Sequence, residues 1–178
     1  MSDLQTTNRE EESEQEYPVQ VYVYDLSHGL ASVYSPMILG RSIPAIYHTS
    51  VVIRNTEYYL DQGIKSHSPP GFTKYGTPIE ILDVGTTYID DQILQDFISE
   101  LNDHEDMKYH AISYDLFQNN CNHFTDVLIE FLVGKNLDDR ILKLPELVLS
   151  TGNGRLLQQL ISGAGVNSNP WQYNNSYQ

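Results

Sequence analysis

The sequence has a single cysteine, few basic residues and no long hydrophobic run. One cysteine, Cys121, excludes an internal disulfide framework, so we expect a reducing compartment, which is the cytoplasm, the nucleus or both. No apolar stretch approaches the roughly 20 residues that cross a bilayer, which argues against an integral membrane protein. The formal charge is −14, with 10 Lys and Arg against 24 Asp and Glu. Such a chain repels phosphate backbones, which argues against a nucleic-acid partner.

Motifs for metals and phosphates are also missing. The lone cysteine comes with no close His–His or His–Glu spacing, so the sequence carries no zinc signature. Gly71 and Gly76 lack the strand–turn–helix setting and the lysine of a phosphate-binding loop. We therefore expect neither a metal nor a cofactor.

The periodic patterns lie in one central domain, residues 18–161, between two polar ends. Residues 1–17 are acidic and residues 162–178 are rich in Gly, Ser, Asn and Gln, so both are predicted to be disordered tails. Strands are predicted at 19–24, 47–54, 56–61 and 79–83, a long loop at 63–78, an extended piece at 109–114, and helices at 27–39, 90–101, 121–133, 145–149 and 154–161. Because strands precede most helices, the predicted class is α+β with a mostly antiparallel sheet.

Cys121 lies at the predicted start of a helix. Asn119 or Asn120 is the expected N-cap, Gly134 closes the helix, and apolar residues recur with helical spacing between them. The unpaired amides and the positive dipole end at a helix start favour a thiolate and can stabilise an oxyanion. A lone cysteine is more often a small buried hydrophobe, but its polar neighbours favour a nucleophile.

A cysteine nucleophile needs an imidazole within reach, and the chain has six histidines. His48 lies near the start of the strand YHTSVVI, which is a rigid mount for a base. Strand alternation places it on one face with Ser50 and Val52. His123 follows Cys121 by two residues on the helix, so its side chain is expected to point away from the thiol.

Several segments, in order, resemble the PPPDE superfamily and within it the DeSI-type desumoylating isopeptidases: VYVYDLSHGLA, IYHTSVVI, GI with PPGFT, NNCNHFTDVLIEFLVG and LPELVLSTGNGRLL. The resemblance covers nearly all of the predicted domain. It implies a permuted papain-like fold, with the histidine strand before the cysteine helix, and a Cys–His dyad without an obligatory third acid. His48 falls on the family's H-T-S motif and Cys121 on its N-C-N-x-F motif. The implied substrates are ubiquitin-like modifier conjugates, with SUMO favoured over ubiquitin, and the implied assembly is a homodimer.

The same resemblance implies a narrow groove near Cys121 for the glycine-ended tail of the modifier. Its expected walls include Tyr47 and the loop 68–75, and the groove residues named for it are Tyr47, Pro69, Pro70, Gly71, Asn120 and Asn122. Two residues depart from the family pattern, namely Tyr47 in place of Trp and His123 in place of Thr. The group that orients His48 is open, with Asn119 and Asp61 as the choices.

Two other functions remain open. The N-C-x-H-F form also resembles the lecithin:retinol acyltransferase-like proteins, so a protein S-acyl thioesterase or a lipid acyl hydrolase or transferase is one alternative. The same dyad suffices for a thioester, which is an easier acyl donor than an amide. The other alternative is a module that binds a modifier without turning it over.

Overall fold

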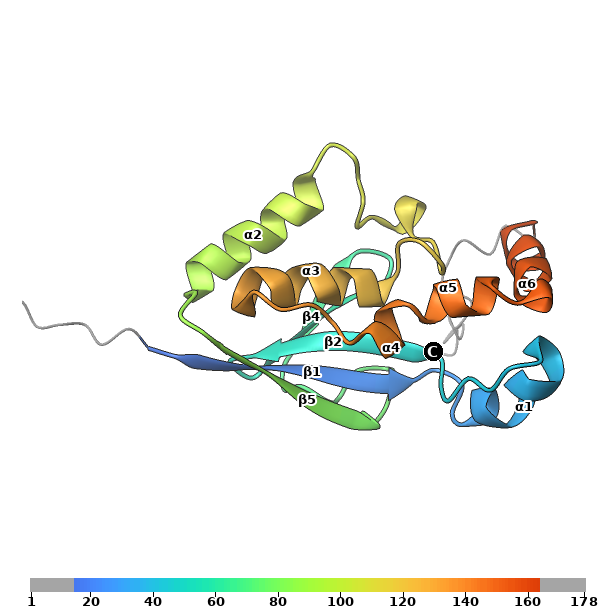
Figure 1. Ribbon diagram of the computed structural model, residues 1–178. Coiled ribbons are helices and arrows are strands. Elements are labelled where there is room, and N and C mark those ends of the chain that lie inside the picture. Colours follow the sequence, from blue (N-terminus) through green and yellow to red (C-terminus); the bar gives the residue numbers. More distant parts are fainter. Residues whose placement is uncertain (1–14, 164–178) are drawn as a thin grey trace, which may run out of the picture.

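A strand that is buried along its whole length occupies the middle of the sheet. The computed structural model describes residues 15–163, and its sheet has the order β4-β3-β2-β1-β5, with every neighbouring pair antiparallel (Figure 1). The strands are β1 Tyr17–Asp25, β2 Tyr47–Ile53, β3 Thr56–Leu60, β4 Ile64–His67 and β5 Glu80–Thr87. All seven residues of β2 are buried, because β1 and β3 flank its edges and side-chain layers cover both of its faces.

The register of β2 places its two ends at defined positions. His48 lies opposite Tyr24 of β1, and Val51 lies between Val21 of β1 and Tyr58 of β3. Arg54 and Asn55 link β2 to β3 with φ values of 47° and 63°, the backbone of a tight hairpin turn.

The two faces of the sheet are covered by different segments. Tyr47, Val51 and Ile53 of β2 belong to the main core with Phe124 and Leu128 of the cysteine helix. Alternation sends His48 and Ser50 to the other face, where a second cluster contains Tyr24, Tyr59 and Tyr75. The loop that follows β4, rather than a helix, therefore covers the face that carries His48.

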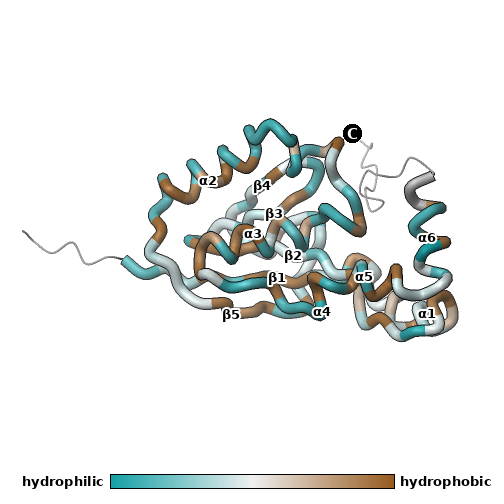
Figure 2. Tube along the Cα trace, turned by 45° about the horizontal axis from the view of Figure 1, so that its top comes forward, coloured by the Kyte–Doolittle hydropathy of each residue, from teal (hydrophilic) through white to brown (hydrophobic). Residues whose placement is uncertain are grey.

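Helices gather on one face and at one end of the sheet. Figure 1 shows α3 running along the sheet and α1, α5 and α6 beyond the end at which β2 begins. Figure 2 shows hydrophilic and hydrophobic positions alternating along α2, as expected for a helix with one face toward the protein. The helices are α1 Leu30–Leu39, α2 Asp91–Asp103, α3 Cys121–Val133, α4 Asp139–Leu142, α5 Leu144–Leu149 and α6 Gly152–Gly163, with a 3-10 turn at Ala111–Ser113.

The predicted α+β class with a mostly antiparallel sheet is confirmed, and the boundaries of α3 match the prediction, with Asn120 as N-cap and Gly134 as C-cap. Three local predictions were wrong. The loop predicted at 63–78 contains β4, the extended piece predicted at 109–114 contains a 3-10 turn, and the helix predicted from residue 27 begins at Leu30, with Gly29 as its cap at φ 87°. Helix α4 was not predicted.

The structure describes only a few residues of the two predicted tails. Residues 1–14 and 164–178 lie outside the described residues, and α6 continues to Gly163, two residues into the segment predicted as the second tail. Within residues 15–163, no helix combines the length and hydropathy of a membrane span.

Candidate active site

Cys121 is the first residue of α3, and side chains close the helix start around it. Asn120 Oδ1 accepts hydrogen bonds from the amides of Asn122 at 2.9 Å and His123 at 3.3 Å. In return, Nδ1 of His123 accepts the amide of Asn120 at 3.2 Å, which completes a capping box. His123 is therefore part of the cap, and its side chain turns back to Asn120.

The thiol of Cys121 is buried and protonated in this conformation. Cys121 is 3% exposed, and its Sγ donates to Oδ1 of Asn122 at 3.7 Å. Burial raises the pKa of Cys121 to about 11, although the amides of Thr49 and Asn122 and the hydroxyl of Tyr114 favour the thiolate. The helix start thus acts in the predicted direction, but desolvation of the sulfur outweighs it.

Asn122 connects the cysteine helix to the histidine strand. Its Nδ2 donates to the carbonyl oxygen of Tyr47 at 3.1 Å, and its Oδ1 accepts from the hydroxyl of Thr49 at 2.9 Å. These two residues flank His48 in the chain. The amide of Asn122 therefore fixes β2 against α3 on both sides of the proposed base.

His48 is 1% exposed and surrounded by aromatic rings. The ring of Tyr75 stacks on its imidazole, with 3.6 Å between centroids and 29° between planes, and Tyr24 and Tyr59 stand at 5.9 and 6.1 Å. Burial lowers the pKa of His48 to about 3; the charge of Asp61 acts in the opposite direction and that of Lys74 in the same direction. His48 is therefore neutral near pH 7, the form in which an imidazole accepts a proton.

His48 and Cys121 lie at the same end of the sheet, because the amide of Thr49, the next residue of β2, acts on the Cys121 sulfur. Within residues 15–163, Nε2 of His48 has no hydrogen-bond partner. Catalytic hydrogen bonds in unliganded enzymes are often long and tighten only when substrate binds.

The two choices for the group that orients His48 are placed differently. Asp61 follows β3, is 2% exposed and pairs with Lys74 at 2.7 Å and Lys65 at 3.3 Å, and its charge acts on His48. Asn119 lies before α3, where its Nδ2 donates to the carbonyl oxygens of Lys108 and Ser113. Of the two, only Asp61 acts electrostatically on the imidazole, and its orienting role stays a prediction.

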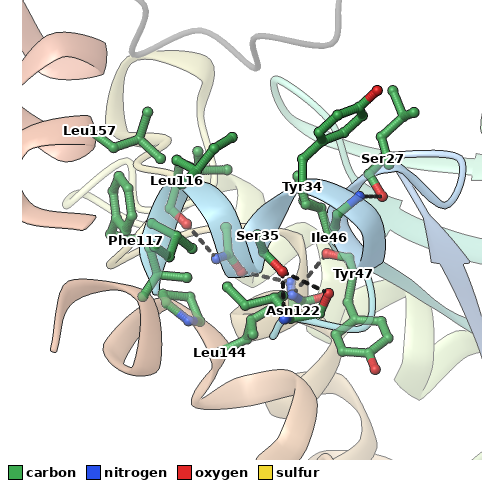
Figure 3. Close-up of a pocket in the computed structure, with 18 residues that line it drawn as sticks. Ser27, Tyr34, Ser35, Ile46, Tyr47, Leu116, Phe117, Asn122, Leu144 and Leu157 are labelled. Atoms are coloured by element: carbon green, nitrogen blue, oxygen red, sulfur yellow. Dashed lines mark hydrogen bonds between the residues drawn. The ribbon is translucent and has the colours of Figure 1, made fainter. Parts of the chain in front are cut away.

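The predicted groove residues fall into two groups. Tyr47, Asn120 and Asn122 line an apolar pocket of about 480 Å³, whose other walls come from α1, α5, α6 and the segment before α3. Figure 3 shows Tyr34 and Tyr47 on one side of this pocket and Leu116, Phe117 and Leu157 on the other. Pro69, Pro70 and Gly71 belong instead to the loop over the opposite face, where Gly71 donates its amide to Glu57 at 2.7 Å.

Sequence reasoning missed two residues, one that holds this loop and one that belongs to it. Glu57 is fully buried on β3, although the alternation of TEYYLD suggested no special role for it. Tyr75 covers His48 from the loop 68–75, which was predicted as a wall of the groove and not as a cover for the imidazole. Asn122 was predicted as a groove residue from the N-C-N sequence around Cys121.

Within residues 15–163, no group of three or more His, Cys, Asp or Glu is placed to hold a metal ion.

Comparison with known proteins places this site in a family. Residues 17–161 match the family described as "PPPDE putative peptidase domain". The chain is 39% identical over 150 residues to "Desumoylating isopeptidase 1" of Homo sapiens, an alignment that covers 84% of this chain and 88% of the human protein. It is 33% identical over 156 residues to the Xenopus laevis protein of the same name, covering 88% of this chain and 90% of that protein. The matched region contains both the strand of His48 and the helix of Cys121, and the chain therefore belongs to the PPPDE peptidase family as a cysteine-type hydrolase.

Proposed function

We propose that this protein is an isopeptidase that removes a SUMO-type modifier from protein lysines, with Cys121 as nucleophile and His48 as base. The observation that carries the proposal is the position of Cys121 as the first residue of α3, where the helix start meets the strand of His48. The names of the human and Xenopus relatives support isopeptide hydrolysis and SUMO as the modifier.

The reaction begins from two neutral groups. His48 takes the proton of the Cys121 thiol as Sγ attacks the carbonyl carbon of the glycine–lysine isopeptide bond. The amide of Cys121 donates to the oxyanion that forms, because the amides of Asn122 and His123 are already bonded to Asn120. The imidazolium then gives its proton to the departing lysine amine, leaving a thioester between the modifier and Sγ. Water hydrolyses that thioester with His48 as base, and the thiol is regenerated.

A cleavage panel tests the proposal. SUMO and ubiquitin fusions are incubated with the wild-type protein, Cys121→Ala and His48→Asn, and circular dichroism confirms that each variant is folded. We expect the wild-type protein to cleave the SUMO fusion faster than the ubiquitin fusion, and both variants to be inactive. Cleavage by folded Cys121→Ala would remove Cys121 as the nucleophile, and faster cleavage of ubiquitin would reassign the modifier.

A second candidate function is hydrolysis of S-acyl thioesters on proteins. The apolar pocket beside Asn120 and Asn122 favours it, because its walls are mostly aliphatic and aromatic and its volume is about 480 Å³. Pockets of such size and lining bind apolar ligands. A fluorogenic long-chain acyl thioester, assayed beside the SUMO fusion, distinguishes the two functions.

The proposal extends to assembly and compartment. Helix α1 exposes several large apolar side chains, among them Val33 at 65% and Met37 at 76%, which favours the expected homodimer. A single free thiol favours the reducing cytoplasm or nucleus. Sedimentation velocity of the wild-type protein and Met37→Glu tests the dimer, which the charged residue is expected to weaken. Imaging of a fluorescent fusion tests the compartment.

A further inference from the structure

The loop between β4 and β5 crosses the sheet face that carries His48. We call residues 68–76 the strap. A Cβ added at Gly71 would lie 3.7 Å from the ring of Tyr22 on β1, so the strap lies directly against the sheet there. Thr73 and Tyr75 are buried at 8% and 9% exposure, and the amide of Gly76 donates to the carbonyl oxygen of Thr73 at 3.2 Å. The strap is thus packed against the protein.

Two buried carboxylates of β3 and its end hold the strap. Glu57, which is fully buried, accepts the amide of Gly71 at 2.7 Å, and it also accepts the hydroxyls of Tyr24 and Ser50, each at 2.7 Å. Asp61 pairs with Lys74 at 2.7 Å. Hydrogen bonds and ion pairs to buried charged groups are the stronger kind in proteins. The strap is therefore tied down both at Gly71 and at Lys74, the residue before Tyr75.

Tyr75 stacks on His48 next to the second of these attachments. The distance of 3.6 Å between ring centroids is closer than that to either of the other two tyrosine rings around the imidazole. Within the described part of the chain, neither the Tyr75 hydroxyl nor Nε2 of His48 has a hydrogen-bond partner. The contact between these two side chains is thus made by their ring faces and not by a hydrogen bond.

We propose that Tyr75 is a positioning residue for the catalytic base: the strap seats its ring on the imidazole of His48, fixes the plane of that imidazole and keeps water from it. The inference rests on the proposed function for the role of His48 as base. It assigns control over the protonation of that base to Tyr75, a residue outside the dyad. Tyr75 acts only through His48 and is assigned no contact with substrate.

The charged and titratable groups around His48 leave burial as the main influence on its protonation. They are Tyr24 on β1, Glu57 and Tyr59 on β3, Asp61 after β3, Lys74 and Tyr75 on the strap, and Cys121 on α3, whose charge acts on Tyr75. Asp61 favours the protonated imidazole and its partner Lys74 opposes it, so the two offset each other in part. Removing the ring of Tyr75 admits water, which stabilises the imidazolium and raises the pKa of His48.

The experiment compares Tyr75→Ala with Tyr75→Phe in the full chain, and Tyr88→Ala, at an exposed tyrosine, is the matched control. Proton NMR follows the imidazole of His48 from pH 4.5 to 8, with the resonance assigned from His48→Asn. We expect no titration of His48 in the wild-type protein, Tyr75→Phe or Tyr88→Ala. In Tyr75→Ala we expect a midpoint roughly two or more pH units above that of the wild-type group, because desolvation is the main cause of its low pKa.

Kinetics give the second readout. We expect the acid limb of kcat/KM for the SUMO fusion to move to higher pH in Tyr75→Ala, and kcat to fall roughly tenfold while KM stays within about twofold, as expected for a misplaced base. If Tyr75→Ala does not fold, Tyr75→Leu replaces it; this residue fills the space without a ring, and it is expected to lower kcat while His48 remains untitrated.

Three results would overturn the inference: an untitrated His48 in folded Tyr75→Ala, a Tyr75→Phe variant that behaves like Tyr75→Ala, or a wild-type kcat in Tyr75→Leu. The NMR titration needs no substrate. If the wild-type protein cleaves neither fusion, the proposed function fails, while the titration still decides whether the ring of Tyr75 controls the protonation of His48.

Discussion

The side-chain amide of Asn122 donates to the carbonyl oxygen of Tyr47 at 3.1 Å, across 75 residues of sequence. Together with its bond to Thr49, it joins the residue after the nucleophile to the residues on both sides of the proposed base. Asn122 is 4% exposed, so replacement by Leu leaves buried polar partners unpaired, at a cost of about 2–3 kcal/mol in the free energy of unfolding. Urea unfolding measures this loss. We also expect kcat for the SUMO fusion to fall more than the rate constant for alkylation of Cys121 by iodoacetamide.

We call the two hydrogen bonds of the Asn122 side chain to β2 the clamp. Thr49→Val is its matched variant, because it removes one of these two bonds and keeps the side-chain shape. We expect it to cost about 1 kcal/mol and to retain most of the turnover. Exposed Gln159→Ala is the control. An Asn122→Leu protein with wild-type stability and turnover would contradict the role of the amide as a clamp.

The second prediction concerns the reactivity of the thiol. Because burial raises the pKa of Cys121 to about 11, the thiolate fraction near pH 7 is lower than that of an ordinary cysteine. We expect alkylation of the unliganded protein by iodoacetamide to be at least about tenfold slower at pH 7 than after unfolding in urea, and still to be rising at pH 9.5. Mass spectrometry of time points measures both rates. A rapid rate that is flat from pH 6 to 9 would mean that the resting enzyme already holds a thiolate.

The third prediction concerns acid stability. The pKa of His48 is about 3 in the folded protein against 6.5 for an exposed histidine, so the unfolded chain binds a proton first as the pH falls. Stability therefore declines from about pH 6.5 downwards, by about 2 kcal/mol from His48 alone at pH 5. Asp25 and Asp61 have lowered pKa values, so their contribution is present above pH 4 and lost only below it.

Urea unfolding at pH 7, 6 and 5 separates these groups, because in that window His48 takes up its proton in the unfolded chain while Asp25 and Asp61 stay ionised. His123, whose pKa burial also lowers, contributes in the same sense as His48. We expect His48→Asn to lose less stability between pH 7 and 5 than the wild-type protein. Equal losses in the two proteins would show that His48 is not buried as a neutral group.

The fourth prediction tests the pocket. Ala31 lines it from α1, so Ala31→Trp is expected to fill part of its volume of about 480 Å³. If the pocket accepts acyl chains, this variant loses at least about tenfold in kcat/KM for a long-chain thioester and keeps its activity on a short-chain thioester and on the SUMO fusion. Arg41→Trp, at an exposed position near the end of the same helix, is the control. Equal effects on long and short chains would exclude the pocket as an acyl site.

Local patterns were sufficient to predict the elements that carry the proposed dyad, but not the residues that surround it. Asn120, the apolar stripe and Gly134 each act within one helix, so α3 was predictable. The alternation in YHTSVVI likewise predicted β2 and the shared face of His48 and Ser50. These features depend on neighbours a few residues away, which a sequence displays directly.

The surroundings of His48 and Cys121 depend on contacts between distant segments. Asp61 and Lys74 meet through the strap, and nothing in the intervening Gly and Pro residues indicates that Tyr75 will reach His48. The helix start favours a thiolate at Cys121, but the packing that buries the sulfur has the larger effect on its pKa. Both results follow from tertiary burial, which single-sequence periodicity does not report.

The two faces of the sheet are packed by different segments, with α3, which begins at Cys121, against one face and the strap, which covers His48, against the other. A change of sequence in the strap can therefore alter the environment of the imidazole while the cap of α3, formed by Asn120 and His123, keeps its hydrogen bonds. The strap is therefore a segment whose sequence can be exchanged separately from that of α3. With His48 as the proposed base, replacing residues 68–76 is expected to change the pH dependence of the activity without any change in the sequence of α3.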